Sequence, residues 1–146
     1  MFNKRTASAL SRISRIRSQA NAIIEAELSA RGMSGLVPAH GSVLACLYAN
    51  QGPVPMKSIV EFTGRAKSTV TVMIRTLEKH GYISRVRSTD DGRVTLVALA
   101  PRGVEIQKDF DEISTQLLST FYGIMPAEQR ALLIDLLEQV ESNFTN

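Results

Sequence analysis

The chain has 146 residues, of which 44% are hydrophobic and 21% charged, and its formal net charge at pH 7 is +3. This length and balance are typical of one folded soluble domain, or of a compact module that pairs with a second copy. No apolar run approaches the ~20 residues that cross a bilayer, and no apolar segment follows the basic start to make a secretory signal. One cysteine, Cys46, excludes an internal disulfide and a multi-cysteine zinc site. We therefore expect a cytoplasmic protein.

Helical patterns fill the first 80 residues. Residues 3–31 contain neither glycine nor proline and carry apolar residues at helical spacing, which predicts one long helix. Three shorter helices follow, each bounded by glycine or proline. They are predicted at about 38–50, 56–62 and 66–80.

The pattern changes after Gly81. Residues 82–88 and 93–99 alternate apolar and other side chains, which is the period of half-buried strands. The segment Thr89-Asp-Asp-Gly between them is rich in turn formers. The fold class predicted from this order is mainly α with a small β wing, that is, a winged helix-turn-helix lobe joined to terminal helices.

Pro101 and Pro126 open two further helices, the first ending at about Tyr122. These helices and the one over 3–31 spread apolar residues over more surface than a small winged-helix lobe could cover. We therefore expect two copies to interlock them in a homodimer, the alternative being that they pack only within one chain. The predicted organisation is an N-terminal dimerisation helix in 1–35, a DNA-binding region in 36–100 and C-terminal dimerisation helices in 101–146.

The charges are unevenly distributed. Residues 55–93 hold eight Lys and Arg against four acids, whereas residues 103–146 hold two against eight. A polyanion would therefore meet the middle of the chain and not its C-terminal end. A solvated basic face without a ligand is the plainer alternative, but the order of a helix followed by a basic hairpin favours DNA.

The helix predicted at 66–80 has two faces. Apolar residues at i, i+3, i+4 and i+7 form one stripe that we expect to be buried: Val70, Met73, Ile74 and Leu77. The opposite face carries short hydroxyl and basic side chains, which donate to phosphate oxygens and reach base edges. The candidate DNA-binding residues here are Arg65, Lys67, Ser68, Thr69, Thr71 and Arg75. Arg75, two turns into the helix, is suited to a bidentate contact with guanine.

The predicted hairpin is also basic. Arg85, Arg87 and Arg93 are candidate contacts to the DNA backbone or to a narrow minor groove, whose negative potential attracts arginine. Asp90 and Asp91 lie at the tip, where a carboxylate would repel DNA unless it holds an arginine in position. We therefore assign Asp91 to the support of Arg93 and not to DNA contact.

Three segments together carry a family resemblance: Lys67-Ser-Thr-Val-Thr, Leu77-Glu-Lys-His-Gly-Tyr-Ile, and Asp90-Asp-Gly-Arg-Val-Thr-Leu-Val-Ala-Leu. With the order of elements over roughly residues 5–144, they resemble the multiple-antibiotic-resistance regulator (MarR) family. The resemblance implies a homodimeric transcription regulator on a pseudo-palindromic operator, with a repressor as the first interpretation and an activator as the alternative. Its two recognition helices would enter successive major grooves about 34 Å apart. It also assigns Asp91 and Arg93 to the wing and Lys67 to Thr71 to the start of the recognition helix.

The resemblance further implies a small aromatic or anionic effector, bound between the dimer core and the DNA-binding lobe. His40, at the foot of the second helix, lies where relatives line that cavity and is the candidate effector residue. Two positions depart from the family. Val72 stands where many members carry arginine, and Ala100 replaces a frequent threonine that would cap the next helix. The operator sequence therefore stays open, with Arg75 as the candidate substitute contact.

The sequence offers little for other chemistry. It holds no motif of a serine hydrolase, zinc protease, P-loop or dinucleotide-binding enzyme, so no catalytic residue, cofactor or metal is assigned. His40 and His80 are too far apart in sequence to form a metal pair, and each is interpreted as solvated or helix-capping. Cys46 lies in an apolar run and is interpreted as buried and inert, not as a peroxide sensor. The alternative function is a winged-helix protein-interaction module without DNA binding.

Overall fold

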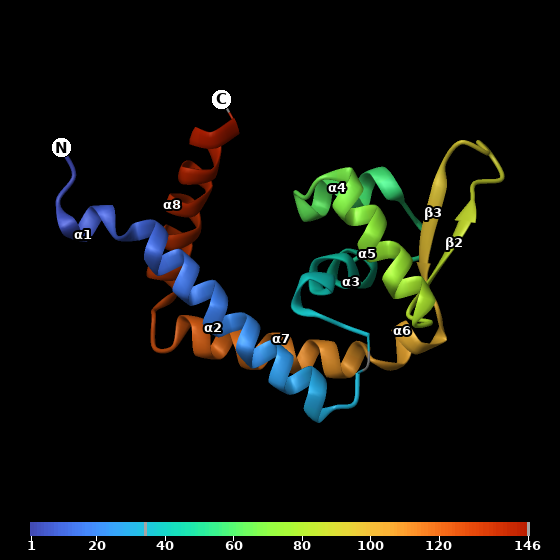
Figure 1. Cartoon of the computed structure of the whole chain (residues 1–146), viewed down its shortest axis with the longest axis horizontal. Coiled ribbons are helices and arrows are strands. Elements are labelled where there is room, and N and C mark those ends of the chain that lie inside the picture. Colours follow the sequence, from blue (N-terminus) through green and yellow to red (C-terminus); the bar gives the residue numbers. More distant parts are fainter. Residues whose placement is uncertain (34, 146) are drawn as a thin grey trace.

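The computed structural model describes residues 1–33 and 35–145. It is mainly helical, with one small antiparallel sheet. Figure 1 shows a lobe of short helices and the sheet on one side, and three long helices, α2, α7 and α8, on the other. The predicted fold class is therefore confirmed.

The N-terminal part is two helices, α1 (Lys4–Ala7) and α2 (Ala9–Ala30), where the sequence predicts one. The interruption falls at Ser8, whose hydroxyl donates to the carbonyl oxygen of Arg5 (2.7 Å). Such side-chain bonds to nearby backbone compete with helix continuation. α2 contacts α7 (Gln107–Tyr122) and crosses it obliquely (Figure 1).

The lobe begins with η1 (Pro38–His40) and α3 (Gly41–Tyr48), and continues through α4 (Met56–Thr63) to α5 (Lys67–Lys79). All four match the predicted helices, with α4 ending one residue beyond the predicted boundary. The core of the lobe is made of aliphatic residues from these elements and the sheet, and its fully buried members include Val43, Leu44, Ile59, Val70, Ile74, Leu77 and Val97. The predicted buried stripe of α5 is thus confirmed.

Gly81 ends α5 and turns the chain into the sheet. Its φ of +80° is in the left-handed region that favours glycine. The N–H of Tyr82 then donates to the carbonyl oxygen of Leu77 (3.0 Å) and the N–H of Gly81 to that of Glu78 (3.0 Å), which is a Schellman motif. As a result Tyr82 is fully buried, and the hairpin starts at a defined angle to α5.

The sheet has three antiparallel strands in the order β1-β3-β2. β2 (Ile83–Arg87) and β3 (Thr95–Leu99) are the predicted hairpin, with Arg85 opposite Val97. β1 (Val54–Pro55) was not predicted, because two residues, one of them a proline, are too few to show a strand period. Its Val54 pairs with Val97 on the other edge of β3, which anchors the loop before α4 to the sheet.

The C-terminal part is α6 (Pro101–Glu105), α7 and α8 (Ala127–Thr145), so the helix predicted from Pro101 to Tyr122 is interrupted at Ile106. α6 approaches the sheet closely, since a Cβ added at Gly103 would collide with the carbonyl oxygen of Tyr82. The hydroxyl of Tyr48 donates to the carbonyl oxygen of Gly103 (2.6 Å). These contacts join α6 to the lobe.

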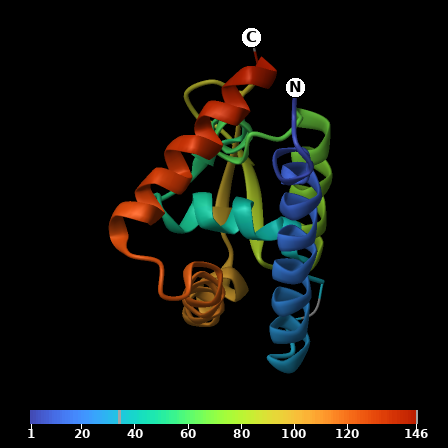
Figure 2. The same ribbon diagram turned by 90° about the vertical axis from the view of Figure 1, so that its left-hand side faces the viewer.

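The long helices leave much apolar surface uncovered. Among the residues that the structure describes, neither α2 nor α8 has a buried side chain. Their exposed apolar residues include Leu10, Ile13, Ile16, Leu132, Ile134, Leu136 and Val140. Viewed from their side of the molecule, both helices stand in front of the lobe (Figure 2). Within the described ranges, no helix combines the length and the apolar character that a membrane span requires.

Candidate nucleic-acid interface

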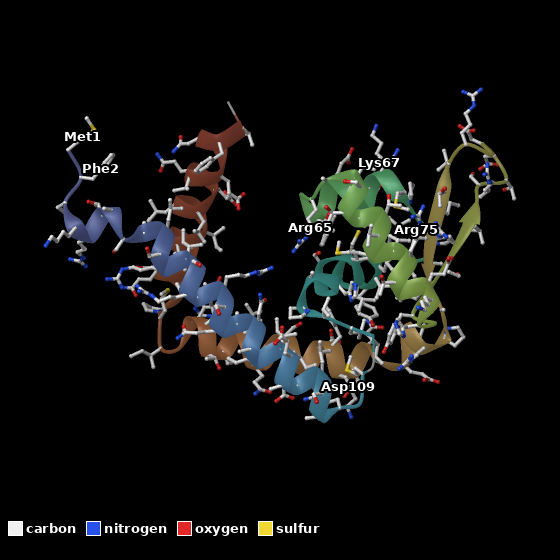
Figure 3. All side chains as sticks on the ribbon, in the orientation of Figure 1. Met1, Phe2, Arg65, Lys67, Arg75 and Asp109 are labelled. Carbon is white, nitrogen blue, oxygen red and sulfur yellow. The ribbon has the colours of Figure 1, made fainter. Side chains whose placement is uncertain are left out.

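The solvent-facing side of α5 is a polar stripe with one apolar member. Ser68, Val72, Arg75 and Lys79 are exposed and follow one another at i, i+4, i+7 and i+11, opposite the buried residues. Figure 3 shows the side chains of Lys67 and Arg75 on the outside of the lobe. The helix thus presents its hydroxyl and basic residues to solvent.

The first turn of α5 is open to a ligand. Its N-cap is Ala66, and within the described part of the chain no side chain caps this end. The first N–H groups of a helix have no intrahelical partner and attract anions. Lys67, Ser68 and Thr69 are exposed around them, so this end combines backbone donors with a cation and two hydroxyls.

The hydroxyl proton of Thr71 is already used in a hydrogen bond within α5. Its Oγ1 donates to the carbonyl oxygen of Lys67 (2.9 Å), one turn earlier. While that bond holds, the hydroxyl can accept a hydrogen bond but cannot donate one to a phosphate. The structure therefore suits Thr71 to accept a hydrogen bond from a donor on a base edge, or to make a van der Waals contact.

Arg85 is tied to α5. Its guanidinium donates to both carboxylate oxygens of Glu78, with Nη2 2.9 Å from Oε1, and its backbone N–H donates to Oε2 (3.2 Å). The neighbouring guanidinium lowers the pKa of Glu78 below its usual range. The pair braces β2 against α5, which sequence reasoning missed because the partner lies seven residues away on another element.

The wing tip is ordered by its own polar side chains. Arg87 donates from Nη1 to the carbonyl oxygen of Gly92 (2.9 Å). Asp91 Oδ1 accepts the backbone N–H of Arg93 (3.0 Å). Asp91 therefore holds the backbone of Arg93 and not its guanidinium. In the described residues, the guanidinium of Arg93 has no hydrogen-bonded or ion-paired partner, so of the three wing arginines it is the one left to solvent.

A cavity of about 320 Å³ lies where α2 and α7 meet the lobe. Its lining is mainly apolar, with polar groups at a few positions: Arg17, His40, Ser42, Arg65 and Ser114. Arg65, a predicted DNA contact, extends in Figure 3 from the junction of α4 and α5 toward the α2 side. The structure thus brings the candidate effector residue His40 to the same cavity as Arg17 and Arg65. These arginines lie 23 residues before His40 and 25 residues after it, so no local sequence pattern links the three.

His40 is buried, with 5% of its surface exposed, so it is not the solvated histidine that the sequence allowed; it takes the other role predicted for it and caps η1. Its Nδ1 accepts the backbone N–H of Val37 (3.1 Å), so the neutral ring carries its proton on Nε2. Burial lowers the pKa of His40, and the charge of nearby His80 lowers it further. The structure therefore brings together two histidines that are far apart in sequence. The described residues hold no group of three or more His, Cys, Asp or Glu side chains that could bind a metal.

Cys46 is buried in the lobe, as predicted. Burial raises the pKa of its thiol, which disfavours the reactive thiolate.

The sequence model of the MarR family matches residues 36–95. The HTH-type transcriptional regulator YdgJ of Bacillus subtilis is 33% identical over 79 residues, which cover 54% of this chain and 48% of that protein. The HTH-type transcriptional regulator SarZ of Staphylococcus saprophyticus is 36% identical over 78 residues, covering 53% and 49%. The chain thus matches about half the length of these curated relatives.

Solved structures are similar over nearly the whole chain. The transcriptional regulator PcaV of Streptomyces coelicolor, in complex with its natural ligand, has a TM-score of 0.79 at 21% identity and covers 97% of this chain and 98% of its own. BpsR of Bordetella bronchiseptica, whose DNA binding is regulated by 6-hydroxynicotinic acid, has a TM-score of 0.72 at 22% identity and covers 88% and 95%. At these identities the likeness extends to the fold alone.

Proposed function

We propose that this chain, which carries a MarR-family domain in residues 36–95, is a transcription regulator that binds a pseudo-palindromic operator as a homodimer. The observation that carries the proposal is the exposed stripe of α5, with an uncapped first turn at one end and a basic hairpin braced beside it. A B-DNA major groove admits one helix, and the N-terminal part of a recognition helix contacts base edges.

The exposed side chains support different roles in DNA binding. Lys67, Ser68 and Thr69 surround the first turn and suit phosphate binding. Arg75 lies further along the stripe, where a bidentate contact with guanine would read sequence. Arg93 suits the minor groove or the backbone next to it. Arg87 would hold the tip, Arg85 would act chiefly as a brace, and Thr71 would contact a base edge.

The uncovered helices support a homodimer. α2 and α8 leave a row of aliphatic side chains in water, and their burial against a second copy would contribute about 25 cal/mol for each Å² removed from solvent. This supports dimerisation segments in residues 1–35 and 101–146, flanking a DNA-binding region in 36–100. A two-fold pair would hold two α5 helices for successive major grooves.

The cavity supports control by a small molecule. Its volume of about 320 Å³ is in the range of small-ligand sites, and an apolar lining with Arg17 and Arg65 suits an aromatic or otherwise apolar carboxylate. His40, held neutral by burial, would contribute a hydrogen bond and not a charge. A ligand here touches both α2 and the lobe, and it would shift DNA binding only as far as it prefers one arrangement of the two.

Repression follows if the operator overlaps a promoter, since a bound dimer would exclude the polymerase. A regulator and not an enzyme is the corresponding proposal for the class of protein, and the similarity to HTH-type transcriptional regulators supports it. The alternative, a protein-interaction module, leaves the solvent-facing guanidinium of Arg93 and the cations of α5 without a polyanionic partner.

Selection of bound sequences from random duplexes tests the proposal. We expect an enriched motif of two inverted half-sites whose centres lie about one helical turn apart, and affinity that falls steeply with salt as counterions are released. A scrambled duplex of equal composition is the control. Enrichment of no motif, together with equal affinity for both duplexes, would leave the interaction module as the better account.

A further inference from the structure

Val72 occupies the middle of the exposed stripe of α5. It follows Ser68 by one turn and precedes Arg75 by three residues, so a helix that contacts bases through Arg75 brings Val72 to the same groove. Its exposure is 60%. Single exposed valines are common on proteins, and it is the position of this one, between two candidate DNA contacts, that matters.

Nothing in the part of the chain that the structure describes explains a valine at this position. A β-branched residue costs roughly half a kcal/mol of helix propensity compared with alanine, and Val72 recovers none of it in the core, which lies on the opposite face of α5. Residues that break a local rule without a structural gain often serve function. The neighbouring hydroxyls do not offer an apolar surface of comparable size.

In the major groove only thymine presents an apolar group, its 5-methyl. Resting on the proposed DNA binding, we infer that Val72 is a specificity-determining residue that reads a thymine methyl. Cytosine lacks that methyl, so contact with an isopropyl group separates the two pyrimidines without any hydrogen bond. Where an arginine at this position would favour guanine, the valine moves the preference to an A·T pair.

The geometry also places the thymine. Residues three apart on a helix are separated by about 4.5 Å along its axis, and successive base pairs are about 3.4 Å apart. The thymine read by Val72 should therefore lie within two base pairs of the guanine read by Arg75. Each half-site would contain this pair once.

The test uses the operator obtained by selection and replaces each thymine in turn by deoxyuridine, which lacks only the methyl. For the unmodified protein we expect one thymine per half-site whose replacement weakens binding about fourfold, equivalent to about 0.8 kcal/mol for one buried carbon. The same position should accept 5-methylcytosine, with its guanine partner, better than cytosine. Both effects should shrink in Val72→Ala and persist in Val72→Ile.

Val104→Ala is the matched control, because Val104 is a similarly exposed valine (56%) on α6, outside the stripe. It should keep the full response to deoxyuridine. A chain that binds the operator but responds to no single deoxyuridine, or a Val72→Ala variant with an unchanged response, overturns this inference and leaves the proposed regulator intact. Failure to bind any operator would instead overturn the proposed function.

Discussion

The imidazole ring of His80 lies directly against the backbone of Gly35, so closely that a Cβ at Gly35 would collide with the ring. His80 is the residue that follows α5, and Gly35 belongs to the connection from α2 to the lobe. The contact therefore joins the end of the candidate recognition helix to the chain that leads out of α2. Because Gly35 also has a φ of +83°, only glycine suits this position.

Gly35→Ala should destabilise the protein more than Gly32→Ala. Both glycines have positive φ, so each variant bears the strain of a left-handed alanine, roughly 1–2 kcal/mol, but only Gly35 meets the His80 ring. We expect the Gly35 variant to lose a further ~1–3 kcal/mol through overpacking. Urea unfolding measures the difference. If His80→Ala in the Gly35→Ala background restores none of it, the ring is not the cause.

Arg93→Ala and Arg85→Ala should differ on DNA, although both remove one wing arginine. Arg93 has its guanidinium in solvent, so its loss should weaken binding to all sequences and reduce the slope of log affinity against log salt by about 1. Arg85 is held by Glu78, so its loss should chiefly lower the melting temperature. Fluorescence anisotropy at several salt concentrations separates the two. Equal salt slopes in both variants would contradict the assignment.

Stability should fall as the pH drops below about 6.5, in part through His40. Its pKa in the folded state is lowered from 6.5, so the unfolded chain binds a proton more readily and acid favours unfolding. The loss of stability starts near the pKa of His40 in the unfolded chain and is complete below its pKa in the folded protein. His40→Asn keeps an acceptor for the Val37 N–H, and its melting temperature should depend less on pH between 7 and 5. An unchanged pH profile would show that His40 carries no part of the effect.

Leu136→Glu should disrupt the proposed dimer. Leu136 is half exposed on α8, which has no buried side chain among those the structure describes. A charge at this position would stay in water in the monomer and cost no stability there. In the dimer interface the same charge would lose its hydration. We expect sedimentation to show a lower association constant with an unchanged helical content. Val86→Glu is the control, because Val86 is similarly exposed (51%) on β2, outside the proposed dimerisation segments, and this variant should remain as associated as the parent chain.

Arg17→Gln should weaken the binding of aromatic carboxylates and leave DNA affinity intact. Arg17 lines the cavity from α2 and lies away from the stripe of α5. Isothermal titration with benzoate and hydroxybenzoates should show at least a tenfold loss, the scale of one charge-assisted hydrogen bond. Arg12→Gln on the same helix is the control. Equal losses in both variants would indicate a general charge effect and not a site.

Local patterns were sufficient for much of the lobe. The apolar spacing of α5 determined its buried face, Gly81 its end, and alternation with a polar turn the hairpin, because each depends on residues within a few positions of one another. The resemblance to the MarR family rests on the same stretch, which is where the family model matches. The breaks at Ser8 and Ile106 escaped prediction, since neither glycine nor proline stands at either position.

What the sequence by itself determined is therefore which residues α5 and the wing expose, because a helix or strand has a fixed period and its solvent face follows from composition. Only the tertiary structure decided what those residues contact. It paired Arg85 with Glu78, placed Arg65 beside the cavity with Arg17, and brought the ring of His80 against Gly35. These relationships depend on how the elements pack in space, and side chains from different elements meet at distances that no local period encodes.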